Sequence, residues 1–457
     1  MIAQHLKNGL VENAERLFMI HGGQQVTYRQ LAARTESLAQ QLCHLTGKRV
    51  GVRTSSPTTF IPAILALNLV AADVFLLGSR TPAEINRLTR EFSLECILDF
   101  SSYNGTQFSE SVLAPILTPE PQSIHSELSA DKGVTILTSG TTGLPKAARH
   151  TWANLCKPVR TTPLYRHTRW LCLFPLHLYA GLQVFLQAFL NWATLVIPSC
   201  MTPHEIASTI SHQGIQYASG TPSFWRQILY FSGSQGLEPT SLLQITLGGE
   251  VASQALLDQL RRVFPHTRIV HIYACTEMGR LFAVTDGKEG FPLRYLDDPP
   301  EAGVQLKIVD DQLLVTSRTP MTTYIQQEED QPSTPAYFHT GDLVKVAGNR
   351  ILFRGRINEI VNVGGSKVSP LEVESVIRNV PGVAEVRVYP KPSSLTGHIL
   401  AADIIPSPQY SQEQIRLAIQ QMSQIHLQPF QVPRVINFVD QIRMSSAFKI
   451  SRAGPDS

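Results

Sequence analysis

The stretch "TSGTTGLPK", residues 138–146, places four hydroxyl side chains, two glycines and a lysine between an apolar run and a tryptophan-containing segment. Glycines let backbone N–H groups approach phosphate oxygens, hydroxyl groups add donors, and a lysine adds a compact positive charge. The stretch does not match the common nucleotide loop, in which Gly-Lys-Ser/Thr follows a first glycine after four residues. It therefore indicates either a phosphate-binding loop of another kind or a surface turn rich in Gly, Ser and Thr.

The composition is that of a globular protein. Of the 457 residues, 43% are hydrophobic and 16% are charged, and the net charge of +3 gives no support for a nucleic-acid partner. The most apolar segment, residues 61–77, is interrupted by Pro62, Asn68 and Asp73 and is shorter than the ~20 residues of a membrane helix, so we expect a buried helix and no membrane span. Six cysteines without Cys-x-x-Cys spacing and an N-terminus without a secretory apolar core favour a cytoplasmic location.

Strand-like and helix-like segments alternate along most of the chain, which predicts parallel-rich sheets flanked by helices. Strands precede helices at residues 49–54 and 58–72, 73–78 and 82–92, 194–199 and 203–214, 216–221 and 222–231, and 242–249 and 253–264, with further strands at 94–100 and 268–277. Short strands at 304–309 and 312–317 predict a small antiparallel sheet. The fold class is therefore α/β, with this large N-terminal domain (residues 1–355) followed by a small α+β C-terminal domain (residues 356–457).

Four further motifs follow the opening stretch. They are "YACTE" at 273–277, "HTGDL" at 339–343, "FRGRINEIVNVGGSKVSPLEVE" at 353–374 and "FKISR" at 448–452. In this order and at these separations the series resembles the adenylate-forming superfamily, which includes acyl- and aryl-CoA synthetases, the adenylation domains of peptide synthetases, and luciferases. The resemblance covers nearly the whole chain. It makes residues 1–355 the AMP-binding domain and residues 356–457 a mobile lid domain.

The resemblance implies two half-reactions. A carboxylate attacks the α-phosphate of ATP and gives an acyl-adenylate and pyrophosphate, and a thiol then attacks the adenylate and releases AMP. Because the first step brings two anions together, it needs cations and oriented donors where charge builds up. ATP and Mg²⁺ are the implied cofactors, and the thiol acceptor is CoA or the phosphopantetheine arm of a carrier protein on a separate chain.

The resemblance assigns phosphate contacts to two of the motifs. The opening loop would hold the β- and γ-phosphates through Thr138, Ser139, Gly140, Thr141, Thr142, Gly143 and Lys146. In "YACTE", Tyr273 would lie on adenine, Thr276 would reach the α-phosphate, and Glu277 would hold Mg²⁺. The alternatives are a core aromatic for Tyr273 and a solvated acid for Glu277.

Three further positions would complete the nucleotide site. Asp342 of "HTGDL" would accept hydrogen bonds from the ribose hydroxyls, and Arg356 would be a second ribose contact. Gly248 of "LGGE" would form a wall beside adenine and the acyl group, while Glu250 is left without a role. The alternatives are a turn residue for Asp342, a surface ion pair for Arg356 and a tight strand-to-helix turn for Gly248.

Lys449 is the candidate catalytic lysine, because in the superfamily this lysine bridges the carboxylate and the α-phosphate during adenylation. The alternative is an ordinary terminal lysine. Relatives usually have glycine immediately before the lysine, where this chain has Phe448. "KISR" itself matches the pattern well.

The superfamily uses one site for both half-reactions by rotating the C-terminal domain. The hinge position is commonly Asp or Lys and is Asn358 here, a residue that tolerates unusual backbone angles. After rotation Gly364 and Gly365 would line a tunnel for pantetheine, and Lys367 would meet a phosphate. The alternative for these residues is a β-turn beside a surface lysine.

The segment "FPLHLYAGLQVF", residues 174–185, bears on the acid substrate. Amino-acid-activating relatives have an Asp in this segment that pairs with the α-ammonium group, whereas this chain offers His177 and no acid. A buried ammonium without a partner is costly, so we expect an aliphatic or aromatic acid without an α-amine. His177 would gate the pocket or be structural, and Ala274, in place of the usual glycine, could narrow it.

Three functions remain open. The first is an acid–thiol ligase of the acyl-CoA synthetase type, and the short chain is similar to the o-succinylbenzoate–CoA ligases. The second is a stand-alone adenylating enzyme that loads a separate carrier protein. The third is a catalytically weakened nucleotide-binding homologue, which is suggested by Phe448, Ala274 and Asn358.

Overall fold

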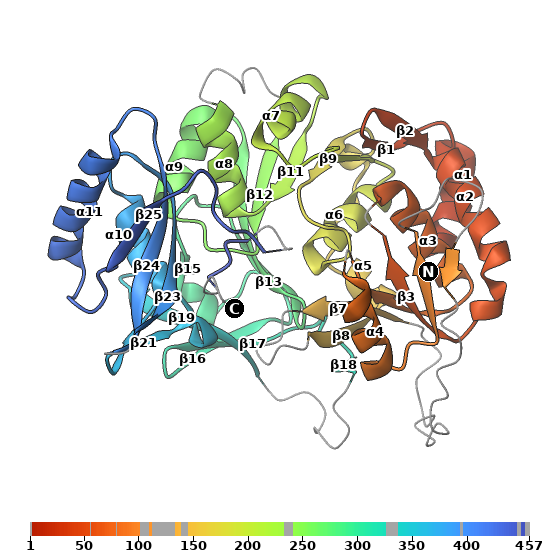
Figure 1. Cartoon of the computed structure of the whole chain (residues 1–457). Helices are drawn as coiled ribbons and strands as arrows, with labels where there is room; N and C mark the ends of the chain where they lie inside the picture. The colour runs from red at the N-terminus through yellow and green to blue at the C-terminus, as the bar shows by residue number, and fades with distance from the viewer. Residues whose placement is uncertain are drawn as a thin grey trace.

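The structure is a computed structural model. It describes residues 2–54, 56–78, 80–100, 109–111, 133–138, 145–232, 241–325, 337–393, 396–445 and 449–452. The chain forms two large mixed sheets, a small antiparallel sheet and a C-terminal α+β unit, and the strands of the two large sheets are interleaved along the sequence (Figure 1). The predicted α/β fold class, including the small antiparallel sheet, is confirmed.

The first large sheet has seven strands in the order β18-β8-β7-β4-β3-β5-β6. They are β3 (Arg49–Arg53), β4 (Asp73–Leu76), β5 (Cys96–Asp99), β6 (Ser109–Ser111), β7 (Gly133–Thr138), β8 (Lys146–Thr151) and β18 (Thr323–Tyr324). β3, β4, β5 and β7 are parallel, while β6, β8 and β18 pair antiparallel with their neighbours. Strand β18 comes from a distant part of the sequence and lies at one edge.

The second large sheet has eight strands in the order β14-β13-β12-β11-β9-β10-β1-β2. They are β1 (Leu17–His21), β2 (Gln24–Thr27), β9 (Arg169–Cys172), β10 (Thr194–Ile197), β11 (Tyr217–Gly220), β12 (Gln244–Gly248), β13 (Arg268–Cys275) and β14 (Gly279–Val284). The central strands are parallel, and the hairpins β1–β2 and β13–β14 close the two edges.

Several helices begin where the sequence supplies a side-chain cap. Thr27 and Thr81 form capping boxes at α2 (Tyr28–Gln41) and α4 (Pro82–Glu91), and Ser411 does so at α11 (Gln412–His426). The other helices are α1 (Ile2–Asn13), α3 (Pro57–Leu69), α5 (Trp152–Cys156), α6 (Tyr179–Phe189), α7 (Pro203–His212), α8 (Pro222–Ser232), α9 (Gln254–Val263) and α10 (Pro370–Arg378). Short 3₁₀ turns are η1 (Cys43–Leu45), η2 (Pro163–Tyr165), η3 (Leu293–Leu296) and η4 (Ile357–Glu359).

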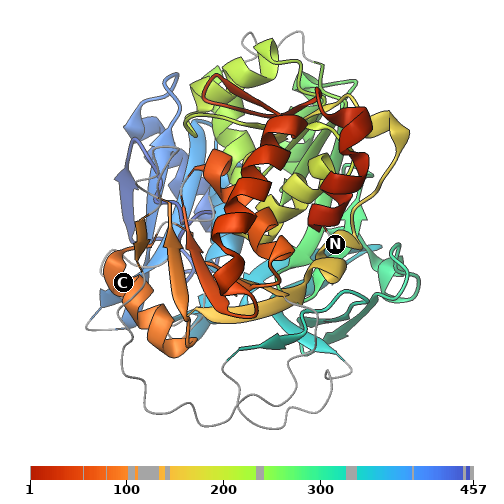
Figure 2. The same cartoon turned by 90° about the vertical axis from the view of Figure 1, so that its right-hand side faces the viewer.

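The main core lies between the two large sheets. Side chains of α3 and α6 share one hydrophobic cluster with strands of both sheets, so these two helices separate the sheets. The apolar segment 61–77 is divided between α3, which is almost entirely buried, and β4. In Figure 2 the helices of the first hundred residues, coloured red to orange, lie at the front of the molecule. Within the described residues no helix is both long and apolar enough to cross a membrane.

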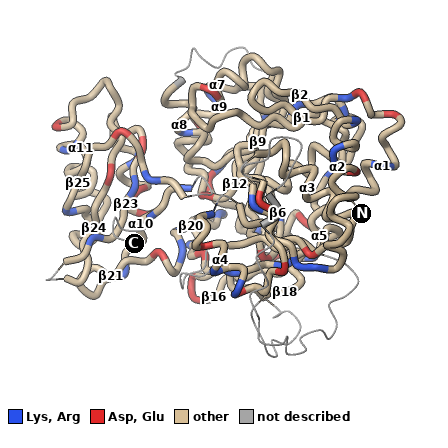
Figure 3. Tube along the Cα trace, turned by 45° about the vertical axis from the view of Figure 1, so that its right-hand side comes forward, with Lys and Arg blue, Asp and Glu red and all other residues tan. Residues whose placement is uncertain are grey.

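Two smaller units complete the chain. The small sheet has the order β15-β20-β19-β17-β16, with β15 (Phe291–Pro292), β16 (Gln305–Val309), β17 (Gln312–Thr316), β19 (Phe338–Ala347) and β20 (Arg350–Arg356). The C-terminal unit contains the hairpin of β21 (Val361–Val363) and β22 (Ser366–Val368) and a sheet of β23 (Val383–Ser393), β24 (Gly397–Pro406) and β25 (Val435–Phe438). The predicted boundary between residues 355 and 356 falls at the last residue of β20 and stays a prediction. Lys and Arg are interspersed with Asp and Glu along the described chain (Figure 3).

Gly181, in the first turn of α6, offers a test of the packing between α6 and the loop before it. A Cβ atom there would lie 2.1 Å from the carbonyl oxygen of Pro175, a backbone atom that cannot rotate away. We therefore expect Gly181→Ala to destabilise the protein by roughly 1–3 kcal/mol, as measured by chemical denaturation. Gly248→Ala is the matched control, because the nearest atoms there are 3.9 Å away. Equal stability of G181A and the wild type would contradict this packing.

Candidate active site

The predicted site residues gather where the strands of both large sheets end. Thr138 ends β7, Gly248 ends β12, and Tyr273 lies in the last part of β13. Open α/β sheets bind ligands at this carboxyl edge. Thr138 and Lys146 are register partners of β7 and β8, so the two ends of the opening loop lie side by side. Five predicted phosphate contacts, Ser139, Gly140, Thr141, Thr142 and Gly143, lie outside the described residues.

Tyr324 links the predicted phosphate lysine to the predicted magnesium ligand. Its hydroxyl donates a hydrogen bond of 3.0 Å to Oε1 of Glu277, and Nζ of Lys146 lies 5.3 Å from the centre of its ring. Burial, followed by the Glu277 carboxylate, raises the pKa of Tyr324, so the phenol stays protonated and remains a donor. The sequence motifs do not point to Tyr324, which reaches the site because β18 pairs with β8.

A buried histidine holds the "YACTE" segment in place. Nε2 of His150 on β8 donates to the carbonyl oxygen of Thr276 over 2.7 Å. Burial lowers the pKa of His150 to about 4, so the ring is neutral at pH 7 and the proton on Nε2 is fixed by its carbonyl acceptor. On the other side, the backbone N–H of Met321 donates to the carbonyl of Glu277 over 2.7 Å. Thr276 and Glu277 are therefore positioned from two different elements.

Tyr273, Asp342 and Arg356 form one cluster. The Tyr273 hydroxyl donates to Oδ2 of Asp342 over 2.5 Å, and Nε of Arg356 donates to Oδ1 over 2.8 Å. The Tyr273 ring packs against Phe282 and Phe353, with centroids 5.0 and 5.1 Å away. Burial and the Asp342 carboxylate raise the pKa of Tyr273. Each Asp342 oxygen keeps a second lone pair, so a diol could still bind there.

Lys449, near the C-terminus, reaches the end of β12. Gly249 has a left-handed φ of +82°, and a Cβ there would lie 3.0 Å from Cε and 3.6 Å from Nζ of Lys449. Partial desolvation and the nearby Arg356 lower the pKa of Lys449, while the carboxylates of Glu250, Asp342 and Glu359 oppose this shift. Phe448, which precedes it, lies outside the described residues.

Gly248 has room for a Cβ atom. A Cβ at this position would have no atom closer than 3.9 Å, where it would meet the carbonyl of Ile272 and Cζ of Phe174. The packing therefore does not require glycine at residue 248, and its place as a wall beside adenine and the acyl group stays a prediction.

His177 packs across the ends of the two large sheets. His177 comes after β9 in the chain, and its ring lies against Gly78, which comes after β4. A Cβ atom at Gly78 would be 2.6 Å from Nε2 of His177. Burial and the positive charge of Arg80 lower the pKa of His177 to about 4, so it is neutral. These contacts fit a structural histidine as well as a gate, and the gating role stays a prediction. Ala274 is partly buried and packs against the main core between the two large sheets.

The residues predicted for the hinge and the thiol tunnel lie outside this cluster. Asn358 is exposed in η4. Gly364 and Gly365 form the exposed turn of β21–β22 with φ of +56° and +88°, values that favour glycine. Their hydrogen bonds go to Thr396 and Asn362 of the same unit, and Lys367 beside them is exposed.

The charges of the site fit a magnesium nucleotide. Among the described residues neither Lys146 nor Lys449 has a carboxylate within ion-pair distance, and the Glu277 carboxylate is bonded to a neutral phenol. The described residues contain no group of three or more His, Cys, Asp or Glu that could enclose a metal ion. Magnesium is commonly held by one or two carboxylates together with substrate phosphates, and Glu277 matches that arrangement.

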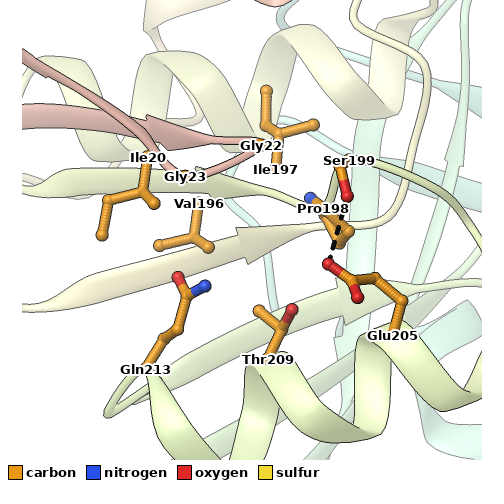
Figure 4. A pocket seen from close by; sticks show the side chains of 10 residues that line it. All are labelled: Ile20, Gly22, Gly23, Val196, Ile197, Pro198, Ser199, Glu205, Thr209 and Gln213. Carbon is orange, nitrogen blue, oxygen red and sulfur yellow. Dashed lines mark hydrogen bonds between the residues drawn. The ribbon is translucent and has the colours of Figure 1, made fainter.

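Two surface hollows contain none of the predicted residues. One, of about 160 Å³, lies between the β1–β2 turn and α7 and is lined in part by Ser199 and Glu205 (Figure 4). The other, of about 490 Å³, lies beside Arg350. The candidate active site is therefore identified by the chemistry of its residues and not by the volume of a surface hollow.

Comparisons with known proteins identify the family and the fold. The profile described as AMP-binding enzyme matches residues 7–318, and that of the AMP-binding enzyme C-terminal domain matches residues 372–449. The 2-succinylbenzoate–CoA ligase of Staphylococcus aureus strain MSSA476 is 24% identical, over 96% of this chain and 97% of the relative. An E. coli MenE variant with bound OSB-AMS has a TM-score of 0.76 at 22% identity, covering 98% of this chain and 96% of that one. The anthranilate CoA ligase AuaEII with anthranoyl-AMP has a TM-score of 0.77 at 21% identity, covering 98% and 95%.

The buried histidines predict a pH dependence of stability. Burial lowers the pKa of His150 and His271 from 6.5 to about 4 in the folded protein. Between these values the unfolded chain binds more protons than the folded protein, so the free energy of unfolding falls as the pH drops from 6.5 to 4. Chemical denaturation at several pH values measures this slope. The double variant H150Q/H271Q, which keeps a donor at both positions, should have a shallower slope, and an unchanged slope would contradict the assignment.

Proposed function

Since the chain belongs to the family of AMP-binding enzymes and is an AMP-forming acid–thiol ligase, we propose that it activates a carboxylic acid without an α-amine and transfers the acyl group to CoA. ATP and Mg²⁺ serve the first step. One observation carries this proposal. The side chain of Lys449 lies against Gly249, near the Asp342–Arg356 ion pair. This contact brings a cation from the C-terminal domain to the strand ends where a nucleotide would bind.

Charge is supplied to the reacting phosphates from two sides. Lys146 would face the leaving pyrophosphate. Glu277, which Tyr324 orients, would hold Mg²⁺, and the ion would supply positive charge to the phosphates. Thr276 contacts the α-phosphate. Lys449 spans the attacking carboxylate oxygen and the α-phosphate, where negative charge builds up as the new acyl–oxygen–phosphorus bond forms and the bond to pyrophosphate breaks.

The nucleoside is held by the remaining cluster. Asp342 accepts hydrogen bonds from the ribose hydroxyls through its unused lone pairs, Arg356 supports it, and Tyr273 faces adenine. Gly248 would form a wall beside adenine and the acyl group, and a Cβ atom would fit there without a clash. For the second half-reaction the C-terminal domain turns about Asn358, and the Gly364–Gly365 turn approaches the thiol.

The acid is an aromatic or aliphatic carboxylate. Residues 174–185 offer no carboxylate to pair with an ammonium group, and His177 in that segment is neutral. The printed names of two similar proteins, a 2-succinylbenzoate–CoA ligase and an anthranilate CoA ligase, support aromatic acids as the first to test. A carrier protein in place of CoA is the alternative acceptor. The cytoplasm, which supplies ATP and CoA, is the expected location.

ATP–pyrophosphate exchange across a panel of aryl, fatty and amino acids tests the proposal. We expect exchange with an aryl or fatty acid and none with α-amino acids. Adding CoA should then yield a thioester and AMP, whereas a thioester formed only on a carrier protein would replace CoA as the acceptor. Absence of exchange with every acid would show that the chain does not adenylate carboxylates and would leave the weakened nucleotide-binding homologue.

Lys449→Ala separates the two half-reactions. Because the ammonium group acts on charge that develops only during adenylation, we expect pyrophosphate exchange to fall by at least about 100-fold. Thioester formation from a supplied acyl-adenylate should be preserved. Lys345→Ala, an exposed lysine of β19, is the matched control and should leave both reactions unchanged. Normal exchange by K449A would remove Lys449 from the mechanism.

A further inference from the structure

Glu250, the residue for which the sequence motifs give no role, joins the two domains beside Lys449. We infer that Glu250 is a positioning residue for Lys449, needed for acyl-adenylate formation and dispensable for thioester formation. The inference rests on the proposed function, because it concerns only how the lysine is placed for the first half-reaction.

The Glu250 carboxylate is shared between two backbone donors. Oε2 accepts the N–H of Ser223 in the first turn of α8 over 2.9 Å, and Oε1 accepts the N–H of Ile450 over 2.9 Å. The Glu250 carbonyl accepts a hydrogen bond of 3.1 Å from Nε2 of His271 on β13. Helix α8 and strand β13 of the N-terminal domain therefore hold Glu250 in place, while Oε1 binds the C-terminal segment. Hydrogen bonds to a carboxylate are roughly twice as strong as neutral ones.

The bond to Ile450 fixes the residue next to Lys449. The Ile450 side chain is buried in a small cluster with Ile405 and Ile442, so both its backbone and its side chain are held. Lys449 extends from this fixed point along Gly249, the residue immediately before Glu250. The strand end that contacts the lysine side chain therefore also holds the lysine's backbone.

A second anchor, Arg452, lies two residues beyond Ile450, and its bonds stay within the C-terminal domain. Arg452 donates to both oxygens of Glu374 over 3.0 and 2.8 Å, and to Glu359 over 3.2 Å. A rotation of the C-terminal domain can preserve these bonds but has to break the one between Ile450 and Glu250. Glu250 therefore acts only in the conformation in which Lys449 lies at the site.

Glu250→Gln tests the inference when both half-reactions are measured. We expect pyrophosphate exchange to fall about 10- to 100-fold, because the amide is a weaker acceptor and cannot serve both N–H groups equally well. Thioester formation from a supplied acyl-adenylate and CoA should match the wild type. An equal loss in both half-reactions, or a loss in neither, would overturn the inference.

A double variant distinguishes positioning from a general structural effect. If Glu250 acts through Lys449, E250Q added to K449A should lower pyrophosphate exchange no further, since the side chain it positions is absent. A further fall in the double variant would overturn the inference. Absence of exchange in the wild type with every acid would instead count against the proposed function, so the two failures are distinguishable.

Variants of Ile450, whose backbone N–H donates to Glu250, give an independent test if E250Q fails to fold. Ile450→Ala keeps the N–H and loses side-chain packing, whereas Ile450→Pro loses both. We expect I450P to show about 10-fold less pyrophosphate exchange than I450A, with equal thioester formation from the acyl-adenylate. Equal exchange by the two variants would show that the bond to Glu250 does not position the lysine.

Discussion

The contact of Lys449 with the glycine turn at the end of β12 is the constraint on which the site depends. Gly249 adopts a left-handed backbone and carries no side chain, so Lys449 can lie along it. Any Cβ there would be 3.0 Å from the lysine and would also strain the turn. Without this contact the ammonium group of Lys449 would not reach the strand ends. The domain interface therefore decides whether the site is complete.

Neutral side chains keep the charges of the site from cancelling one another. The Tyr324 phenol stands between Lys146 and Glu277, and the neutral ring of His150 holds Thr276. Cations and carboxylate thus stay available to phosphates and a divalent ion, at positions fixed before the reaction begins. The Asp342–Arg356 pair is the exception, since its charges already compensate each other and it suits a neutral ribose.

The resemblance of five short, widely separated motifs to one family predicted most of the candidate site. Order and separation of the motifs placed Tyr273, Asp342 and Lys449 in one site, and the structure brings them together. Tyr324 was missed because its place depends on the pairing of β18 with β8, and His150 because it contacts Thr276, 126 residues away on the chain. Neither relation leaves a spacing signal in the sequence. Glu250 had no assignable role because its partner is a backbone N–H 200 residues away. The alternation of strands and helices in the sequence predicted the large sheets. The order of the strands within each sheet is visible only in the structure.

Transfer of oxygen from the acid to AMP is the most direct test of the central claim, which is attack of a carboxylate on the α-phosphate. The enzyme would be incubated with ATP, CoA and an accepted acid carrying ¹⁸O in both carboxyl oxygens, and the products analysed by mass spectrometry. The account predicts AMP with one ¹⁸O atom and pyrophosphate with none. Label in inorganic phosphate together with ADP, or no label in AMP, would contradict it.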